Sequence, residues 1–482
     1  MLTYILAFVL GLAPALQEVF DLPLQLALQR AVLLGCLGWL AGRAYGAGLP
    51  AALGARRFWP VWAAGALSLA SLAASPFRGA VFNEWGNFAA GLLIFVFASF
   101  LEKDEKDKVE RAALAGAWLV FALSLLQAFV LKNFYGRPPL TNLNALALYA
   151  VLIIPPALER ARGWPLAAAM LVLVIWTQSL GAALAGLAAA GFYAASRPSG
   201  ALKSSRWLMA VLGLAAAAIL WKLHGDSVAG RLAWWRGAWE VFLARPLGGF
   251  GHASYTWAQA AFLPAGAFRE RSIYAHNYYL EFLAENGLPA ALAWFWAVFA
   301  AVRARAGLAK YALVAALAHS LADFGLSVPA NFWLFCFLLA SPAAAEPAVR
   351  PAPRAARAGL AAAALLLAAL ASLDLRSLAF ERRAARAAAA AGAGDLPAAE
   401  EALRPELAPG LFRGRALELL GRLSLSDRTA PAGFRSAAYY EQALLENRYS
   451  PAAWGALERI YDQPGLEQAA AGLRARRAEV FK

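Results

Sequence analysis

Apolar residues occupy most of the chain in long continuous runs that short polar stretches separate. About 20 apolar residues form a helix long enough to cross a bilayer, and runs near this length recur as far as residue 375. The pattern predicts an all-α fold, namely a polytopic transmembrane helical bundle of about 12–13 spans. The predicted spans are 2–16, 24–42, 58–74, 87–101, 112–131, 142–158, 164–178, 180–195, 207–223, 278–302, 308–325, 328–342 and 357–374.

The pattern changes after the last span, where apolar positions become spaced instead of continuous. Residues 376–482 hold 13 of the 30 acidic residues of the chain. We therefore predict a membrane domain over 1–375, with a long polar loop at about 224–275, and a soluble helical domain over 376–482. Segment 437–461 combines small and aromatic residues with Pro451 between two predicted helices, which resembles a tetratricopeptide hairpin.

A weaker copy of this repeat pattern runs from Ala384 through Leu417. Helical repeats of this kind bind protein partners, and they also serve as plain structural support. Both roles remain open for the C-terminal domain.

The composition agrees with a membrane protein. With 61% apolar and 15% charged residues, the chain is too hydrophobic for a soluble domain. Its net charge of +14 would suggest nucleic acid in a soluble protein, but basic cytoplasmic loops explain it in a membrane protein. Cys36 and Cys336 lie in apolar runs without metal-ligand spacing, so we expect packing residues and neither a metal nor another cofactor.

The distribution of Lys and Arg predicts the orientation. If the N-terminus starts in the cytoplasm, the short inner connections carry 18 of these residues and the short outer connections carry 3. Cytoplasmic loops of membrane proteins are enriched in Lys and Arg. The long 224–275 loop and the C-terminal domain are therefore expected outside the cytoplasm.

Several polar residues stand in or beside the predicted spans, where an ionisable group is costly and suggests function. Arg30 lies in the second span, and it either binds a ligand or snorkels outward. Asn142 and Asn144 open the sixth span as ligand amides or as ordinary N-caps. His319 and Asp323 are four residues apart, a helical spacing that permits a hydrogen bond, so they form a structural pair or contact substrate.

The outer loop carries arginines that the orientation rule does not explain. Arg231 and Arg236 lie among three tryptophans, and Arg269 and Arg271 follow shortly before His276. The planar guanidinium suits bidentate phosphate binding. Arg231 is the strongest candidate for holding a diphosphate, and the other three arginines are weaker candidates.

His276 stands where this polar loop turns into an apolar helix. A histidine at a helix start is suited to act as a general base, and it can also bind phosphate as a cation. Glu285 lies nine residues on, about half a helical turn around, so a packing role is expected for it. The Asn286-Gly287 pair predicts a helix break before Pro289.

The motifs, taken in order, resemble those of the O-antigen ligase and O-antigen polymerase superfamily. The resemblance covers about 60–345, and one departure is Leu180, where many relatives carry an arginine. The motifs are Asn142-x-Asn144, Thr177-Gln178-Ser179, Arg231-Leu-x-x-Trp235, Pro246-Leu-Gly-x-Phe-Gly251, His276-Asn-x-x-Leu280-x-x-x-x-Glu285-x-Gly287 and His319-Ser-Leu-x-Asp323.

The resemblance implies a metal-independent, inverting glycosyltransferase of the bacterial inner membrane. Such enzymes move a glycan from an undecaprenyl-diphosphate carrier to a hydroxyl acceptor on the periplasmic face. The acceptor remains open among lipid A-core, a growing glycan and a protein. A lipid-linked sugar transporter is the alternative from another class, but the polar residues gather on one face and not at the midplane, where transporters bind their substrates.

Overall fold

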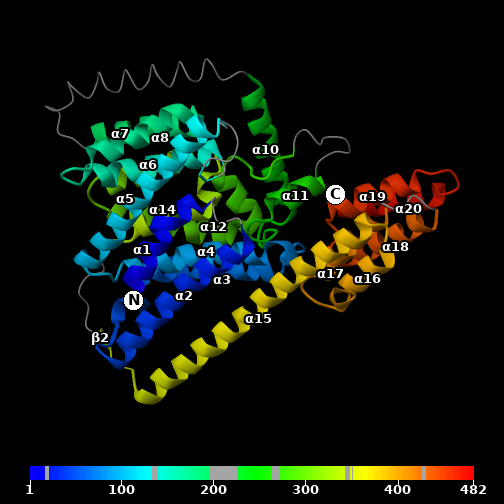
Figure 1. Cartoon of the computed structure of the whole chain (residues 1–482), viewed down its shortest axis with the longest axis horizontal. Coiled ribbons are helices and arrows are strands. Elements are labelled where there is room, and N and C mark those ends of the chain that lie inside the picture. Colours follow the sequence, from blue (N-terminus) through cyan, green and yellow to red (C-terminus); the bar gives the residue numbers. More distant parts are fainter. Residues whose placement is uncertain are drawn as a thin grey trace.

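The computed structural model describes residues 1–16, 21–132, 139–140, 142–195, 225–262, 271–341, 348–349, 351–425 and 430–481. Within them the chain is almost wholly helical, which confirms the all-α prediction (Figure 1). The one sheet found there is the antiparallel pair β1 (Leu49–Pro50) and β2 (Ala348–Val349). Predicted span 207–223 lies outside the described residues.

Every other predicted span contains a helix, although α13 covers only part of the span predicted over 308–325. The N-terminal part contains α1 (Leu2–Leu12) with η1 (Ala13–Ala15), α2 (Leu22–Tyr45), η3 (Ala51–Gly54), η4 (Arg56–Phe58), α3 (Trp59–Ala73), α4 (Arg78–Ala98), α5 (Lys103–Leu125) with the π-helical turn η5 (Leu126–Val130), α6 (Leu143–Leu158), α7 (Trp164–Thr177) and α8 (Leu180–Ala195). The next part contains α10 (Gly225–Ala244), α11 (Tyr255–Phe262), α12 (Tyr278–Ala304), α13 (Ala309–His319), η8 (Gly325–Ser327) and α14 (Pro329–Leu339).

Five helices are long and apolar enough to cross a membrane: α2, α4, α5 with η5, α12, and α15 (Pro353–Gly392). Several shorter apolar helices accompany them, among them α6, α7 and α14. The core of this bundle is α14, whose eleven residues are all buried. A helix that is apolar on every side is stable only when neighbours cover all of its faces, and α4 and α6 are among those packed on α14.

Helix α15 joins the membrane bundle to the C-terminal domain. It is 40 residues long, which corresponds to about 60 Å at 1.5 Å per residue. It runs unbroken through residue 375, so the predicted domain boundary falls inside a helix (Figure 1). The helices after it are α16 (Leu396–Leu403), η9 (Arg404–Glu406), α17 (Arg413–Ser424), α18 (Ala430–Glu446), α19 (Pro451–Tyr461) and α20 (Glu467–Val480).

The C-terminal domain packs as a helical array in which α18 contacts both α17 and α19. Gly421 lets α17 approach the ring of Tyr440, since a Cβ on Gly421 would lie 2.9 Å from that ring. Pro451 begins α19, and Ser450 caps it by accepting from the Ala453 amide. The helical hairpin expected over 437–461 is present, while its assignment to the tetratricopeptide class stays a prediction.

Aromatic residues of the C-terminal domain pack against the loop before α11 and against the end of α11. Tyr449 packs edge-on against Phe250, with ring centroids 5.1 Å apart, and stacks on Phe262. Phe481, beyond the end of α20, also meets Phe262 at 5.3 Å. The domain therefore lies against the loop that carries the glycine motif at 246–251 and against α11, and Figure 1 shows α19 and α20 beside α11.

Candidate active site

His276 lies in the turn that precedes α12. Asn277 is the N-cap of this helix, and its side chain accepts from the amides of Tyr279 and Leu280 at 3.1 Å each. Asn at an N-cap satisfies amides that have no partner within the helix. His276 itself adopts a left-handed backbone with φ of 49°, which is rare for a residue with a side chain and directs its ring away from the helix.

Aromatic rings hold the imidazole on two sides. The Trp234 ring stacks on it with centroids 4.6 Å apart, and Phe324 meets it edge-on at 4.9 Å. The indole of Trp235 donates to the carbonyl oxygen of His276 at 3.1 Å. The loop before α12, helix α10 and the loop after α13 thus fix the ring, while 16% of the His276 side chain remains exposed.

Asp323 lies between His276 and Arg231. Its carboxylate is fully buried, with Oδ1 3.5 Å from His276 Nδ1 and Oδ2 3.8 Å from a terminal nitrogen of Arg231. Arg231 also donates from Nε to the Ala322 carbonyl at 3.2 Å. A buried carboxylate requires a positive or donating partner. Asp323 has both residues within ion-pair distance, and its Oδ1 accepts from the Phe324 amide at 2.9 Å, while among the described residues its Oδ2 and His276 Nδ1 have no hydrogen-bond partner. We refer to Arg231, Asp323 and His276 as the triad.

The helical spacing that would permit a hydrogen bond between His319 and Asp323 is absent, and neither ring nitrogen of His319 has a hydrogen-bond partner within the part of the chain that the structure describes. Helix α13 ends at His319, so Asp323 belongs to the following loop and not to the next helical turn. Sequence spacing implied a continuous span over 308–325, but Ser320 ends the helix and the chain turns toward His276. Asp323 therefore lies beside His276 and Arg231 and not on the face of α13.

His319 lies fully buried beneath the turn between α7 and α8. A Cβ on Gly181 would be 2.9 Å from His319 Nε2, so only glycine lets α8 begin so close to the ring. Gln178 in this turn has a left-handed backbone with φ of 50°. Gly181, two residues after the Thr-Gln-Ser motif, is thus close to His319, and Leu180 begins α8 between the motif and Gly181 in the chain.

Two glycine motifs pack backbone against backbone. The Gly251 amide donates to the Glu285 carbonyl at 2.7 Å, and the Leu288 amide donates to the Pro246 carbonyl at 2.8 Å. Gly249 and Gly287 have positive φ, and a Cβ on either would collide with the other segment. The predicted helix break is present at Gly287, inside α12. The motifs thus lock the 246–251 loop onto the kink of α12.

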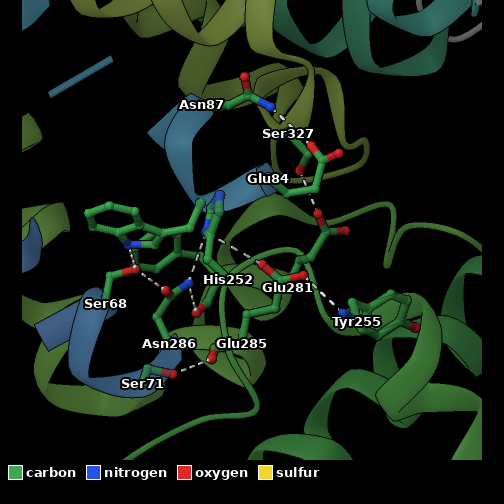
Figure 2. A network of polar contacts seen from close by, with 12 residues as sticks. Ser68, Ser71, Glu84, Asn87, His252, Tyr255, Glu281, Glu285, Asn286 and Ser327 are labelled. Carbon is green, nitrogen blue, oxygen red and sulfur yellow. Dashed lines mark hydrogen bonds and ion pairs between the residues drawn. The ribbon is translucent and has the colours of Figure 1, made fainter. Parts of the chain in front are cut away.

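A polar network surrounds this kink (Figure 2). Asn286 accepts from Ser68 at 2.6 Å and lies 3.3 Å from His252, while Glu285 accepts from the amide of Tyr255 at 3.0 Å. Glu285 therefore caps the start of α11, which fits the packing role expected for it. Burial lowers the pKa of His252 to about 4, so this imidazole is neutral at physiological pH.

Glu281, one turn into α12, connects the two loops that carry the triad. Its Oε2 accepts from the Ala275 amide at 2.7 Å, and its Oε1 accepts from the Ser327 hydroxyl. Ala275 directly precedes His276, and Ser327 lies four residues after Asp323. Sequence reasoning missed Glu281, His252 and Trp234. The glycine motif at 246–251, directly before His252, was the sequence feature that could have marked His252 as a candidate residue.

The remaining candidate residues lie outside the triad. Arg30 forms a two-pronged ion pair with Asp374 of α15, at 2.6 and 2.7 Å. Arg236 pairs with Glu240 on α10, and 82% of its side chain is exposed. Asn142 caps α6 by accepting from the Asn144 amide at 2.7 Å. Arg269 lies outside the described residues, and Arg271 lines a separate cleft between the two domains.

The described part of the chain contains no cluster of three or more His, Cys, Asp or Glu side chains that could hold a metal ion. Both cysteines are free and buried. The side chains that meet at His276 are an imidazole, a carboxylate and a guanidinium. Together these groups can accept a proton and neutralise an anion.

Comparison with known families matches residues 165–295 to the family described as O-antigen ligase. This match supports the O-antigen ligase superfamily for this part of the chain. The O-antigen ligase segment begins in α7, includes Arg231 and His276, and ends in α12 beyond Gly287. His319 and Asp323 follow it. The family supports a membrane protein with glycan transfer of the O-antigen ligase type. No curated protein matches the chain.

Proposed function

We propose that the chain transfers a glycan from an undecaprenyl-diphosphate carrier to a hydroxyl acceptor at the periplasmic face of the bacterial inner membrane. The observation that carries this proposal is the triad, in which Asp323 lies between His276 and Arg231. The family match supplies the general reaction, and the triad supplies groups suited to its chemistry.

In the proposed reaction His276 acts as the general base. A carboxylate beside Nδ1 favours the tautomer that carries its proton there, which leaves Nε2 as the basic atom. Nε2 takes the proton of the acceptor hydroxyl while that oxygen bonds to the anomeric carbon. The bond from this carbon to the diphosphate oxygen breaks, and the electron pair leaves with the diphosphate. A single displacement of this kind inverts the anomeric configuration.

Arg231 is proposed to stabilise the leaving diphosphate. Its contact with Asp323 holds the guanidinium next to His276, and a charge fixed in advance stabilises a transition state without reorganisation. In this mechanism arginine takes the place of a metal ion. Arg271 and Arg236 lie elsewhere in the fold, so they are not assigned to this step. His319 ends α13, which packs against α6 and α8, and Asn144 lies at the start of α6.

The outer location rests on the distribution of Lys and Arg between the connections. It places the triad, the 224–275 loop and the C-terminal domain in the periplasm. We propose that the C-terminal domain is a tetratricopeptide-like module and that it offers a surface to a protein partner. Its firm contacts through Tyr449 and Phe481 are equally compatible with structural support.

The experiment supplies purified lipid-linked glycan with lipid A-core, a repeat-unit glycan or a protein acceptor in turn. Modification of lipid A-core identifies a ligase, extension of the glycan identifies a polymerase, and modification of the protein identifies an O-oligosaccharyltransferase. Movement of the lipid-linked sugar across a vesicle membrane without any transfer would instead support the transporter. Arg231→Ala is expected to abolish transfer, whereas the exposed variant Arg236→Ala is the matched control and is expected to retain it.

A further inference from the structure

A large cleft separates the C-terminal domain from the membrane domain. Its volume is about 1020 Å³, at the upper end of the range for small-ligand sites. One wall is formed by α17, α19 and α20, and the other by the start of α4, helix α11 and Arg271. We call it the interdomain cleft.

In the interdomain cleft, as far as the structure describes it, most of the carboxylates form ion pairs, whereas most of the arginines do not. Among its carboxylates, Glu381 pairs with Arg415 at 3.1 Å, Glu446 pairs with Arg413 at 2.5 Å, and Glu458 pairs with Arg477. Most of the arginines have no such partner. Among the described residues, no carboxylate lies within 4 Å of the lining arginines Arg78, Arg271, Arg422, Arg459 and Arg474.

Aromatic rings and hydroxyl acceptors complete the lining. Trp257 of α11 lines the cleft with 36% of its surface exposed and is the ring available to a ligand, whereas Trp454 of α19 supports the other wall from the core with 4% exposed. Asn447 and Asp462 add an amide and a carboxylate. Flat rings suit the apolar faces of sugars, carboxylates and amides bind their hydroxyls, and guanidinium groups bind anionic substituents in bidentate fashion.

The cleft is also connected to the candidate active site. Helix α11, which carries Trp257, is capped by Glu285 of the α12 kink. Arg271 lies five residues before His276 in the same loop. A ligand held there would contact the two segments that lead to the catalytic residues.

We propose that the interdomain cleft binds an anionic oligosaccharide as the acceptor glycan, an inference that rests on the proposed function. A densely acidic peptide suits the cleft less well, because Glu418 and Asp462 line it and, in the described part of the chain, have no arginine within 4 Å to neutralise them. A saccharide with occasional anionic groups can use both kinds of side chain.

Binding to the purified full-length chain tests this proposal with three probes. These are a hyaluronan tetrasaccharide, which has a carboxylate on every second sugar, the neutral chitotetraose, and tetraglutamate. The hyaluronan probe is expected to bind at least about 10-fold more tightly than either other probe. The double variant Arg459→Gln/Arg474→Gln and the single variant Trp257→Ala are each expected to weaken this binding about 10-fold.

The charge-matched control is Arg382→Gln/Arg386→Gln, which removes two exposed arginines of α15 that lie outside the cleft. It is expected to bind as the wild type does. Absence of hyaluronan binding by the wild type, equal binding of tetraglutamate, or full binding by the cleft variants would overturn the proposal. His276→Ala is expected to bind the probe normally, so loss of transfer in that variant bears only on the proposed reaction.

Discussion

Asp323 Oδ1 lies 3.5 Å from His276 Nδ1, although 47 residues separate them in the chain. The carboxylate is fully buried and has Arg231 on its other side. Such a pair orients an imidazole and stabilises the positive charge that forms when it accepts a proton. We propose that this contact orients His276 as the base of the reaction.

Replacing Asp323 by Asn removes this charge with almost no change in shape. The tautomer of His276 is then no longer held, and we expect kcat for glycan transfer to fall about 100-fold or more. Initial rates with purified donor and acceptor measure the effect. Asp374→Asn, which alters the ion pair of Arg30, serves as the control, and equal losses in the two variants would argue against a specific role for Asp323.

Glu281→Gln tests the connection between the two triad loops. A glutamine has one amide oxygen, so it retains at most one of the two hydrogen bonds that Glu281 accepts from Ala275 and Ser327. We expect kcat to fall about 10- to 100-fold through displacement of His276, with KM little changed. Ser327→Ala removes one of these bonds and should show a smaller loss. A rise in KM alone would contradict a positioning role.

Gly249→Ala tests the contact between the two glycine motifs. Its backbone has φ of 62°, and a Cβ there would collide with the Glu285 carbonyl. We expect the free energy of unfolding to fall by about 3 kcal/mol. Gly248→Ala is a neighbouring control, because the nearest atom to its Cβ would be 3.9 Å away. Thermal unfolding in detergent compares them, and equal midpoints would disprove the close packing.

The burial of His252 predicts a pH dependence of stability. Its folded pKa is about 4, below the ordinary value of 6.5, so the unfolded chain binds the proton first as pH falls. Stability from this residue is therefore lost between about pH 6.5 and pH 4. We expect the unfolding midpoint to drop from pH 7 to pH 5 by less in His252→Asn than in the wild type. An identical drop in both would show that His252 does not contribute.

The positions of the helices were predictable because a membrane span depends on local apolar composition. Each predicted span that the structure describes contains a helix. His276, Arg231 and the break at Gly287 were also identified from motifs. The contact of Asp323 with His276 was not predicted, because it depends on where α13 ends. Periodicity places Asp323 on a helix face, but the residue lies in a loop that turns its side chain elsewhere. The partner of Arg30 was missed for a related reason: Asp374 lies 344 residues away.

The contacts of Gly249 and Gly287 could not be predicted from the sequence either. The motif at 246–251 could be listed from the sequence, but the constraint on Gly249 comes from a carbonyl on another helix. Arg271 shows the same limit, because proximity to His276 in the chain suggested a diphosphate ligand, while the fold places it in the interdomain cleft.

The most direct test of the account is transfer by His276→Ala in purified form, with lipid-linked glycan and the acceptor that the wild type modifies. Folding is checked by the thermal unfolding midpoint, and Arg236→Ala is the matched control. We predict that His276→Ala keeps the wild-type midpoint and loses at least about 99% of the transfer rate, as expected for removal of a general base. Wild-type transfer by His276→Ala would contradict the assignment.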